Sequence, residues 1–76
     1  MRRISMKDLE ASAARLSKVT GQDFEVRNAD GQVGLDYMSH GRTLVDRHET
    51  YLMTKRQLDI VITAMIRGAY AAKGEL

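Results

Sequence analysis

The chain of 76 residues has no cysteine, no proline and no tryptophan, and it holds no long apolar run. Without cysteine, neither a disulfide framework nor a thiolate metal site can form. No stretch comes near the roughly 20 apolar residues that a membrane-spanning helix needs, and residues 1–5 lack the apolar segment of a signal peptide. We therefore expect a soluble, cytoplasmic protein that does not enter a membrane.

A dominant charge is also missing, because 12 basic residues nearly balance 10 acidic ones and leave a net charge of +2. Such a balance does not by itself indicate a nucleic-acid or membrane surface. No repeat or low-complexity tract divides the chain, so we predict one domain over residues 1–76. A domain this short buries only about 60% of its unfolded surface, which makes its core marginal and favours oligomerisation as a support.

The clearest positive signal is a β-hairpin at the centre of the chain. Residues 24–28 and 33–37 flank the sequence Ala-Asp-Gly-Gln, in which Asp30 and Gly31 suit the two positive-φ positions of a two-residue turn. Counting outward from that turn gives the facing pairs Asn28–Val33, Val26–Leu35 and Phe24–Tyr37. The large apolar side chains therefore share one face of the sheet.

A third strand is predicted around residues 42–47. The sequence Ser-His-Gly-Arg at residues 39–42 is a second, weaker turn signal, and a hairpin closed there places Tyr37 opposite Leu44. Leu44 would then join the apolar face of the sheet.

Helical signals flank the strands on both sides. Ser5 followed by Asp8 predicts the start of a first helix, and Gly21 suits its end. Its predicted apolar stripe consists of Met6, Leu9, Ala13, Leu16 and Thr20.

The second helix begins at Thr54-Lys55-Arg56-Gln57, which has the spacing of a capping box, with Met53 placed to pack on Leu58. It ends at Lys73-Gly74. Its broad apolar arc consists of Leu58, Val61, Ile62, Met65, Ile66, Ala69 and Ala72. Its more solvent-exposed side is predicted to carry Asp59, Thr63, Arg67 and Tyr70.

The order of these elements predicts an α+β fold, a two-layer sandwich of helix, antiparallel two- or three-stranded meander, and helix. The arc on the second helix is wider than one sheet contact needs, and Gly68 costs about 1 kcal/mol relative to alanine inside a helix. We therefore expect a close helix contact at Val61, Ala64 and Gly68. The neighbour is either the first helix or a second copy in a homodimer.

Candidate catalytic groups are few. We expect the acidic residues of the hairpin to be solvated carboxylates, with no burial that would adapt them to acid–base chemistry. They are Asp23, Glu25, Asp30 and Asp36. Glu25 opposite Asp36 brings like charges together across the strands, which Arg27 can relieve.

The two histidines do not indicate a metal or catalytic site. Asp46 and Glu49 lie near His48 in sequence, but an extended segment sends neighbouring side chains to opposite sides, and zinc needs three or four converging ligands. Ser39 next to His40 is no catalytic pair, because a base must reach its nucleophile in hydrogen-bond geometry. The glycines form no phosphate-binding loop. We predict a protein that is not an enzyme and holds no metal or cofactor.

Large side chains that the pattern does not place in the core are candidate contacts with a protein partner. These are Met38, Tyr51, Leu52 and Tyr70. The sequence thus favours a protein-interaction module.

Nucleic-acid binding is the alternative. Helix, three strands and helix is also the element order of double-stranded RNA-binding domains, which place phosphate-binding lysines where Lys55 and Arg56 stand. The turn at Asp30-Gly31 lacks the histidine-bearing loop of those domains, and residues 55–58 depart from their Lys-Lys-x-Ala-Lys run.

Four further features are residues 7–10 (Lys-Asp-Leu-Glu), residues 16–26 (Leu-Ser-Lys-Val-Thr-Gly-Gln-Asp-Phe-Glu-Val), residues 54–58 (Thr-Lys-Arg-Gln-Leu) and a late Gly68. In these features the chain resembles the small accessory proteins of temperate bacteriophages and prophages. In those proteins a short helix ending in Thr-Gly leads to a hairpin and a closing helix, and members with known roles often bind and redirect a host protein. The resemblance implies a modulator of a host bacterial protein, acting in the host cytoplasm, and it carries over no catalytic residue.

Overall fold

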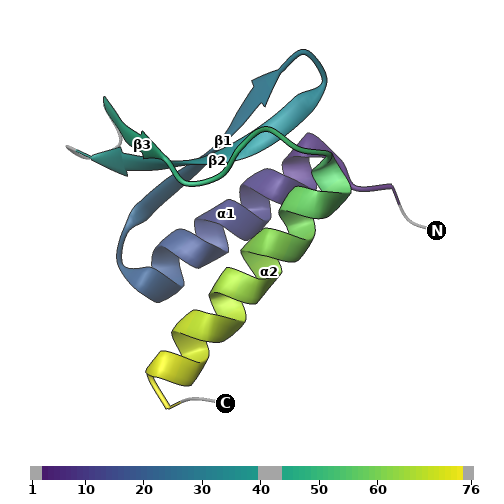
Figure 1. The fold of residues 1–76 in the computed structure, drawn as a ribbon. Helices are drawn as coiled ribbons and strands as arrows, with labels where there is room; N and C mark the ends of the chain where they lie inside the picture. The colour runs from purple at the N-terminus through teal and green to yellow at the C-terminus, as the bar shows by residue number, and fades with distance from the viewer. Residues whose placement is uncertain (1–2, 40–43, 75–76) are drawn as a thin grey trace.

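The computed structural model describes residues 3–39 and 44–74. In chain order its elements are α1 (Met6–Thr20), β1 (Asp23–Ala29), β2 (Gln32–Ser39), β3 (Leu44–His48) and α2 (Lys55–Ala72). The strands form one antiparallel sheet in the order β1-β2-β3, and both helices lie on the same side of it (Figure 1). The predicted α+β fold of helix, meander and helix is confirmed, with three strands in the meander.

Helix α1 begins and ends where the sequence predicts. The Ser5 hydroxyl accepts a hydrogen bond from the backbone N–H of Asp8, and the Asp8 carboxylate accepts one from the N–H of Ser5, which makes a capping box. Gly21 follows in the left-handed conformation, with φ of 74°, and donates its N–H to the Ser17 carbonyl at 2.9 Å. Both ends of α1 are therefore set by local chemistry.

The buried side of α1 differs from the predicted stripe at its C-terminal end, and Met6 at the other end is half-buried against the core. The buried side consists of Leu9, Ala13, Leu16 and Val19. Val19 takes the place predicted for Thr20, whose hydroxyl instead donates to the Leu16 carbonyl at 2.8 Å. A threonine in the last turn can satisfy its hydroxyl this way without entering the core.

The register of the β1–β2 hairpin is the predicted one. Asp30 and Gly31 form the turn with φ of 52° and 80°. Asn28 pairs with Val33, Val26 with Leu35 and Phe24 with Tyr37. The Phe24 and Tyr37 rings lie 5.6 Å apart, centroid to centroid. The apolar members of these pairs lie in the core or pack against it, whereas Asn28 is exposed.

The predicted register of β3 is wrong. Leu44 pairs with Ser39, two residues from its predicted partner, and a further shift between Tyr37 and Met38 leaves Asp46 as an extra residue, so that Tyr37 pairs with Arg47. Leu44 is 58% exposed and does not join the core. The guanidinium of Arg47 covers the Tyr37 ring at 4.4 Å instead. Residues 40–43, which hold most of the predicted turn and the start of the predicted strand, lie outside the described residues.

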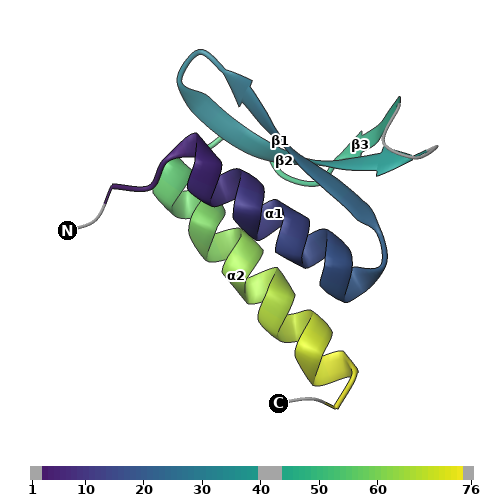
Figure 2. The same cartoon turned by 180° about the vertical axis from the view of Figure 1, so that it is seen from behind.

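Helix α2 starts with the predicted capping box, in which Thr54 and Gln57 each accept a hydrogen bond from the other's backbone N–H. It packs mainly against α1 and reaches the sheet at β2, so it lies on the outer side of α1 (Figure 2). The sequence predicts Tyr70 on the solvent-exposed side of α2, but Tyr70 packs against the core. This correction follows from the position of α1, which covers a side of α2 that the sheet alone would leave open.

The core lies between the sheet and the two helices. Its largest fully buried side chains are Leu9, Leu16, Val33, Leu35, Leu58 and Ile62. At the far end of the helix pair, the Lys73 ammonium donates to the Val19 carbonyl in the last turn of α1. Because α1 and α2 run in the same direction (Figure 1), this ammonium offsets the negative ends of two aligned helix dipoles.

Candidate functional site

Exposed large apolar side chains gather in the second half of the chain. Among the described residues they are Leu44 at 58%, Val45 at 49%, Tyr51 at 91%, Leu52 at 38% and Ile60 at 61% exposure. They belong to β3, to the connection after it and to α2, whereas α1, β1 and β2 contribute none within the described ranges. Single exposed apolar residues are ordinary, whereas adjacent ones such as Tyr51 and Leu52 are candidates for an interaction surface.

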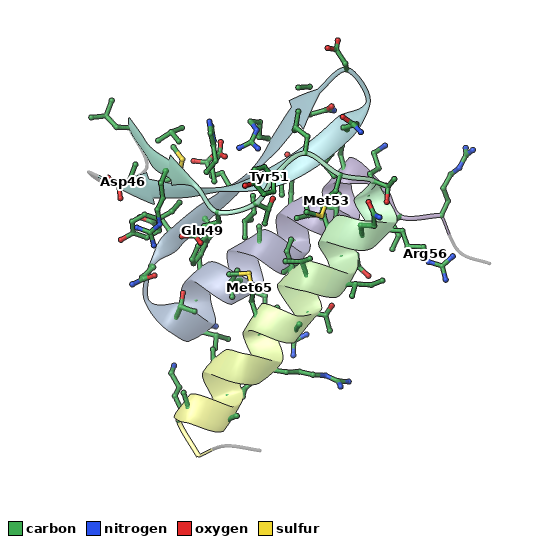
Figure 3. The ribbon with its side chains drawn as sticks, viewed as in Figure 1. Asp46, Glu49, Tyr51, Met53, Arg56 and Met65 are labelled. Carbon is green, nitrogen blue, oxygen red and sulfur yellow. The ribbon has the colours of Figure 1, made fainter. Side chains whose placement is uncertain are left out.

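The connection between β3 and α2, residues 49–53, is held tightly along the edge of β2. The N–H groups of Glu49 and Thr50 donate to the Leu35 carbonyl at 2.8 and 3.2 Å, and Met53 exchanges two backbone hydrogen bonds with Val33 at 2.7 and 2.8 Å. We call residues 49–53 the clamped segment. Figure 3 shows its residues Glu49, Tyr51 and Met53 in front of the sheet, between β3 and α2.

The hydroxyl of Thr50 completes this edge. It accepts a hydrogen bond from the Leu35 N–H at 2.9 Å, in the place of a strand carbonyl, and it donates to the Tyr51 carbonyl at 2.9 Å. The backbone therefore leaves the line of the strand at Thr50 and rejoins it at Met53. Tyr51 and Leu52 lie in the outward bend between these two anchors, which explains their exposure.

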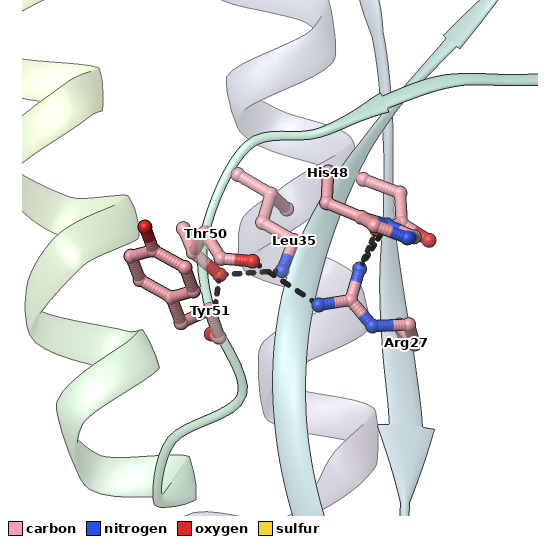
Figure 4. A network of polar contacts seen from close by, with 6 residues as sticks. Arg27, Leu35, His48, Thr50 and Tyr51 are labelled. Atoms are coloured by element: carbon pink, nitrogen blue, oxygen red, sulfur yellow. Dashed lines mark hydrogen bonds and ion pairs between the residues drawn. The ribbon is translucent and has the colours of Figure 1, made fainter.

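A network of polar side chains fastens the clamped segment from the open face of the sheet (Figure 4). Arg27 of β1 donates to the Thr50 carbonyl at 3.1 Å and forms an ion pair with the Asp36 carboxylate. His48 Nδ1 lies 2.7 Å from Asp36 Oδ1 and 2.6 Å from Arg27 Nη1. We call Arg27, Asp36, His48 and Thr50 the Arg27 network.

This network corrects one expectation from the sequence. Asp36 is expected there to be a solvated carboxylate, yet its side chain is only 10% exposed. Arg27 lies beside it, as expected for a residue that relieves the contact between Glu25 and Asp36. A carboxylate this buried is stable because the guanidinium and the imidazole both contact it.

Gly34 makes room for the Arg27 side chain. The two residues face each other in the sheet, and Arg27 passes over Gly34 on its way to Thr50. A Cβ added at Gly34 would lie 2.6 Å from Arg27 Nη2, 3.1 Å from Arg27 Cζ and 3.3 Å from Thr50 Oγ1. To make room for a Cβ, the guanidinium of Arg27 would have to shift, which would disturb its contacts with Thr50 and Asp36. The absence of a side chain at Gly34 therefore leaves the space that the Arg27 guanidinium occupies.

Two glycine substitutions are expected to act in opposite directions. Gly34→Ala should lower the free energy of unfolding by about 1–2 kcal/mol, because the new methyl group displaces Arg27. Gly68→Ala should raise it by roughly 0.5–1 kcal/mol when measured on the dilute single chain, because a Cβ there meets no atom of the same chain within 4 Å and alanine is the better helix former. Urea denaturation of both variants measures the two effects. Equal shifts in one direction would show that Arg27 does not depend on Gly34.

A hollow of about 590 Å³ lies beside the clamped segment. Its lining consists of Arg27, His48, Glu49, Thr50, Tyr51 and Leu52. Figure 4 shows the Tyr51 ring on the far side of the segment from Arg27 and His48. The hollow thus has charged groups on one side and the exposed apolar pair on the other.

The contacts of the network are made among its own members and with the backbone. His48 contacts Asp36 and Arg27 through Nδ1, and within the described residues it makes no hydrogen bond with a serine or threonine hydroxyl. Within residues 3–39 and 44–74, no three side chains of histidine, cysteine, aspartate or glutamate could hold a metal ion together. His40 lies outside the described residues.

The four candidate partner contacts separate into two groups. Tyr51 and Leu52 lie together on the clamped segment and are exposed. Met38 is half-buried and pairs with Val45 across β2 and β3, whereas Tyr70 is half-buried against the core from α2. The sequence analysis did not name Ile60 as a candidate contact, although Ile60 is a large apolar residue outside the predicted apolar arc of α2.

The three residues of the predicted helix contact are at least partly exposed to solvent. Val61 is half-buried, and Ala64 and Gly68 are exposed. Because a Cβ at Gly68 would touch nothing within 4 Å, α1 is not the close neighbour at this position. Of the two alternatives for Gly68, the first helix is therefore wrong.

The basic pair predicted at the start of α2 borders a second hollow. Arg3, Lys55 and Arg56 line it together with Thr54 and the hairpin turn, and its volume is about 480 Å³. Arg56 lies at the first turn of α2, away from the sheet (Figure 3). Three basic side chains and the N-terminus of α2 thus border this hollow.

No family model, no curated protein and no solved structure matches this chain. In the described part of the chain, neither helix combines the length and the apolar character needed to cross a bilayer.

Proposed function

We propose that this protein is a non-enzymatic protein-interaction module whose docking surface is formed by Tyr51 and Leu52 of the clamped segment. The observation that carries the proposal is the 91% exposure of Tyr51 on a segment whose backbone is bonded on both sides of it. Aromatic anchors of this kind dominate many protein interfaces, because they offer a large contact area with few rotatable bonds.

The anchoring of the segment supports this proposal energetically. A flexible loop loses conformational entropy when it binds, at about 1–2 kcal/mol for each residue whose backbone becomes fixed. Residues 49, 50 and 53 already bond to β2, and Arg27 holds the Thr50 carbonyl. Tyr51 and Leu52 are thereby presented to a partner before it arrives.

The resemblance to accessory proteins of temperate phages gives the class of partner. We propose that the partner is a protein of a bacterial host and that binding redirects it by covering a surface. The two proteins then meet in the host cytoplasm, and no covalent bond is made or broken.

Replacing Tyr51 with serine is expected to abolish capture of the partner from a bacterial lysate while leaving the fold intact. The change removes the apolar ring, which is worth about 2 kcal/mol or more at the centre of an interface, and an exposed site contributes little to folding. An affinity pull-down with the tagged full chain, read by mass spectrometry, measures the capture.

The matched control is Leu44→Ser, which makes a similar change at an exposed residue outside the clamped segment. It should capture the same protein as the wild type. Equal capture by the wild type and by Tyr51→Ser would rule out this docking surface, and nuclease treatment that empties the wild-type sample would favour nucleic acid instead.

Nucleic-acid binding is the second candidate, and the hollow bordered by Arg3, Lys55 and Arg56 is the observation in its favour. A nucleic-acid ligand would release counterions, so that its affinity would fall steeply with salt. The double substitution Lys55→Glu with Arg56→Glu would then reduce both the affinity and that dependence. If the protein is an interaction module, the same substitution leaves the capture unchanged.

We also propose that the protein is a homodimer with contacts at Val61, Ala64 and Gly68 of α2. The open space at Gly68 and the small side chain of Ala64 support close approach of another helix. The marginal core of a domain of this length makes such a contact useful for stability.

A further inference from the structure

We infer that two copies of this chain pair through α2 in antiparallel orientation, with Asp59 of each copy against Arg67 of the other. This inference rests on the proposed homodimer and gives it an orientation and a register. It starts from a hollow of about 380 Å³ on the outer side of α2. Asp59, Ile60, Thr63, Ala64 and Arg67 line this hollow.

The outer side of α2 is free for a second copy. α2 packs against α1 on its inner side and contacts the sheet at β2, and no other element of the described chain covers its outer side in Figures 1 and 2. Ile60 projects there with 61% exposure, next to the exposed Ala64. A large side chain beside a small one, repeated in two copies, is the pattern that interlocking helices use.

Two opposite charges on this side are available to a second copy. The side chains of Asp59 and Arg67 make no hydrogen bond or ion pair with any residue in ranges 3–39 and 44–74. They stand eight residues apart on one helix, which is about 12 Å along its axis, too far for contact. A second copy can satisfy both at once.

Only the antiparallel orientation brings opposite charges together. In a parallel pair, Asp59 would lie near Asp59 of the second copy and Arg67 near its Arg67, so that like charges would repel. In an antiparallel pair with its two-fold axis near Thr63, each Asp59 faces the Arg67 of the other copy. The helix dipoles also oppose each other in this arrangement, which is the favourable case.

The apolar contact fits the same register. Ile60 of each copy then lies against Ala64 and the aliphatic stem of Arg67 of the other copy. Val61 and Gly68 flank this contact on one side, and Asp59 and Thr63 flank it on the other. The proposed contact at Val61, Ala64 and Gly68 is thereby continuous with the charged border.

Charge reversal tests the register. Asp59→Arg and Arg67→Asp, each alone, turn two attractive contacts into two repulsive ones and are expected to weaken the dimer at least about tenfold. An equimolar mixture of the two variants should restore wild-type affinity as a heterodimer. In that mixture the two arginines, at positions 59 and 67 of one chain, face the two aspartates at the same positions of the other. Sedimentation equilibrium over a concentration series measures all three samples, and circular dichroism checks that each variant is folded.

Arg15→Asp is the control, since it makes the same charge change on the exposed side of α1 and should leave the dimer unchanged. A wild-type dimer that neither single variant weakens, or a mixture that dimerises no better than its components, overturns the antiparallel register and leaves the homodimer standing. A wild-type protein that stays monomeric at every concentration overturns the homodimer as well. Neither result touches the Tyr51 surface, which the pull-down tests separately.

Discussion

Replacing Leu35 with alanine is expected to lower the free energy of unfolding by about 2–5 kcal/mol. Leu35 is fully buried in the central strand and belongs to a core cluster that also includes residues of both helices. Truncation there leaves a cavity that the surrounding side chains fill only in part. For a domain of this length, with a total stability of roughly 4–11 kcal/mol, thermal or urea denaturation should show a much less stable or largely unfolded protein.

Leu44→Ala is the matched control, because it makes the same change at a leucine that is 58% exposed. Its expected effect is within about 0.5 kcal/mol of the wild type. A Leu35→Ala variant that melts with the wild type would contradict both the register of β1 and β2 and the position of the core.

Replacing Arg27 with leucine is expected to cost about 2–4 kcal/mol, because removing one partner of a buried pair exposes the full desolvation cost of the other. The change leaves the buried Asp36 carboxylate without its guanidinium and leaves the Thr50 carbonyl without a donor from Arg27. His48 still contacts Asp36, which keeps the cost below that of a fully isolated charge. Urea denaturation at neutral pH measures the loss.

A double variant tests whether the buried Asp36 carboxylate depends on the Arg27 guanidinium. When Arg27→Leu is combined with Asp36→Leu, no buried charge remains at this pair, and stability is expected to recover most of the loss. Arg47→Leu is the control for the arginine change, since Arg47 pairs with Asp46 and Glu49 at a side chain that is 58% exposed; it should cost less than about 1 kcal/mol. Equal losses in the single and double variants would show that Asp36 does not depend on Arg27.

Much of the fold was predictable because its signals are local. The turn at Asp30-Gly31 sets the register of the hairpin through the backbone conformation that those two residues accept. The two capping boxes set the helix starts through hydrogen bonds that span three residues. Each signal lies within a few residues of the feature that it determines.

The site was less predictable because it depends on contacts between distant segments. Asp36 is buried because His48 contacts it and the clamped segment pairs with β2. No short sequence pattern predicts either contact. The extra residue at Asp46 shifts β3 without a glycine or proline to mark it. One signal was available, since the predicted register already set Arg27 opposite Gly34.

The side of α2 that meets solvent was also hard to predict. The sequence expectation set both helices against the sheet, whereas α2 packs mainly against α1. This arrangement brings Tyr70 to the core and leaves Ile60 outside. The choice between two apolar neighbours of similar chemistry is a matter of tertiary packing, which periodicity does not encode.

The position of α2 in the chain has a consequence for synthesis. Leu58, Ile62 and Ile66 complete a core whose other buried members lie between residues 9 and 35. A nascent chain emerges from the ribosome N-terminal end first, so α1 and the hairpin emerge before α2 can cover the rest of their apolar surface. Their local signals let them form early, but close packing waits for α2. Until then the emerging chain presents the kind of surface that chaperones bind.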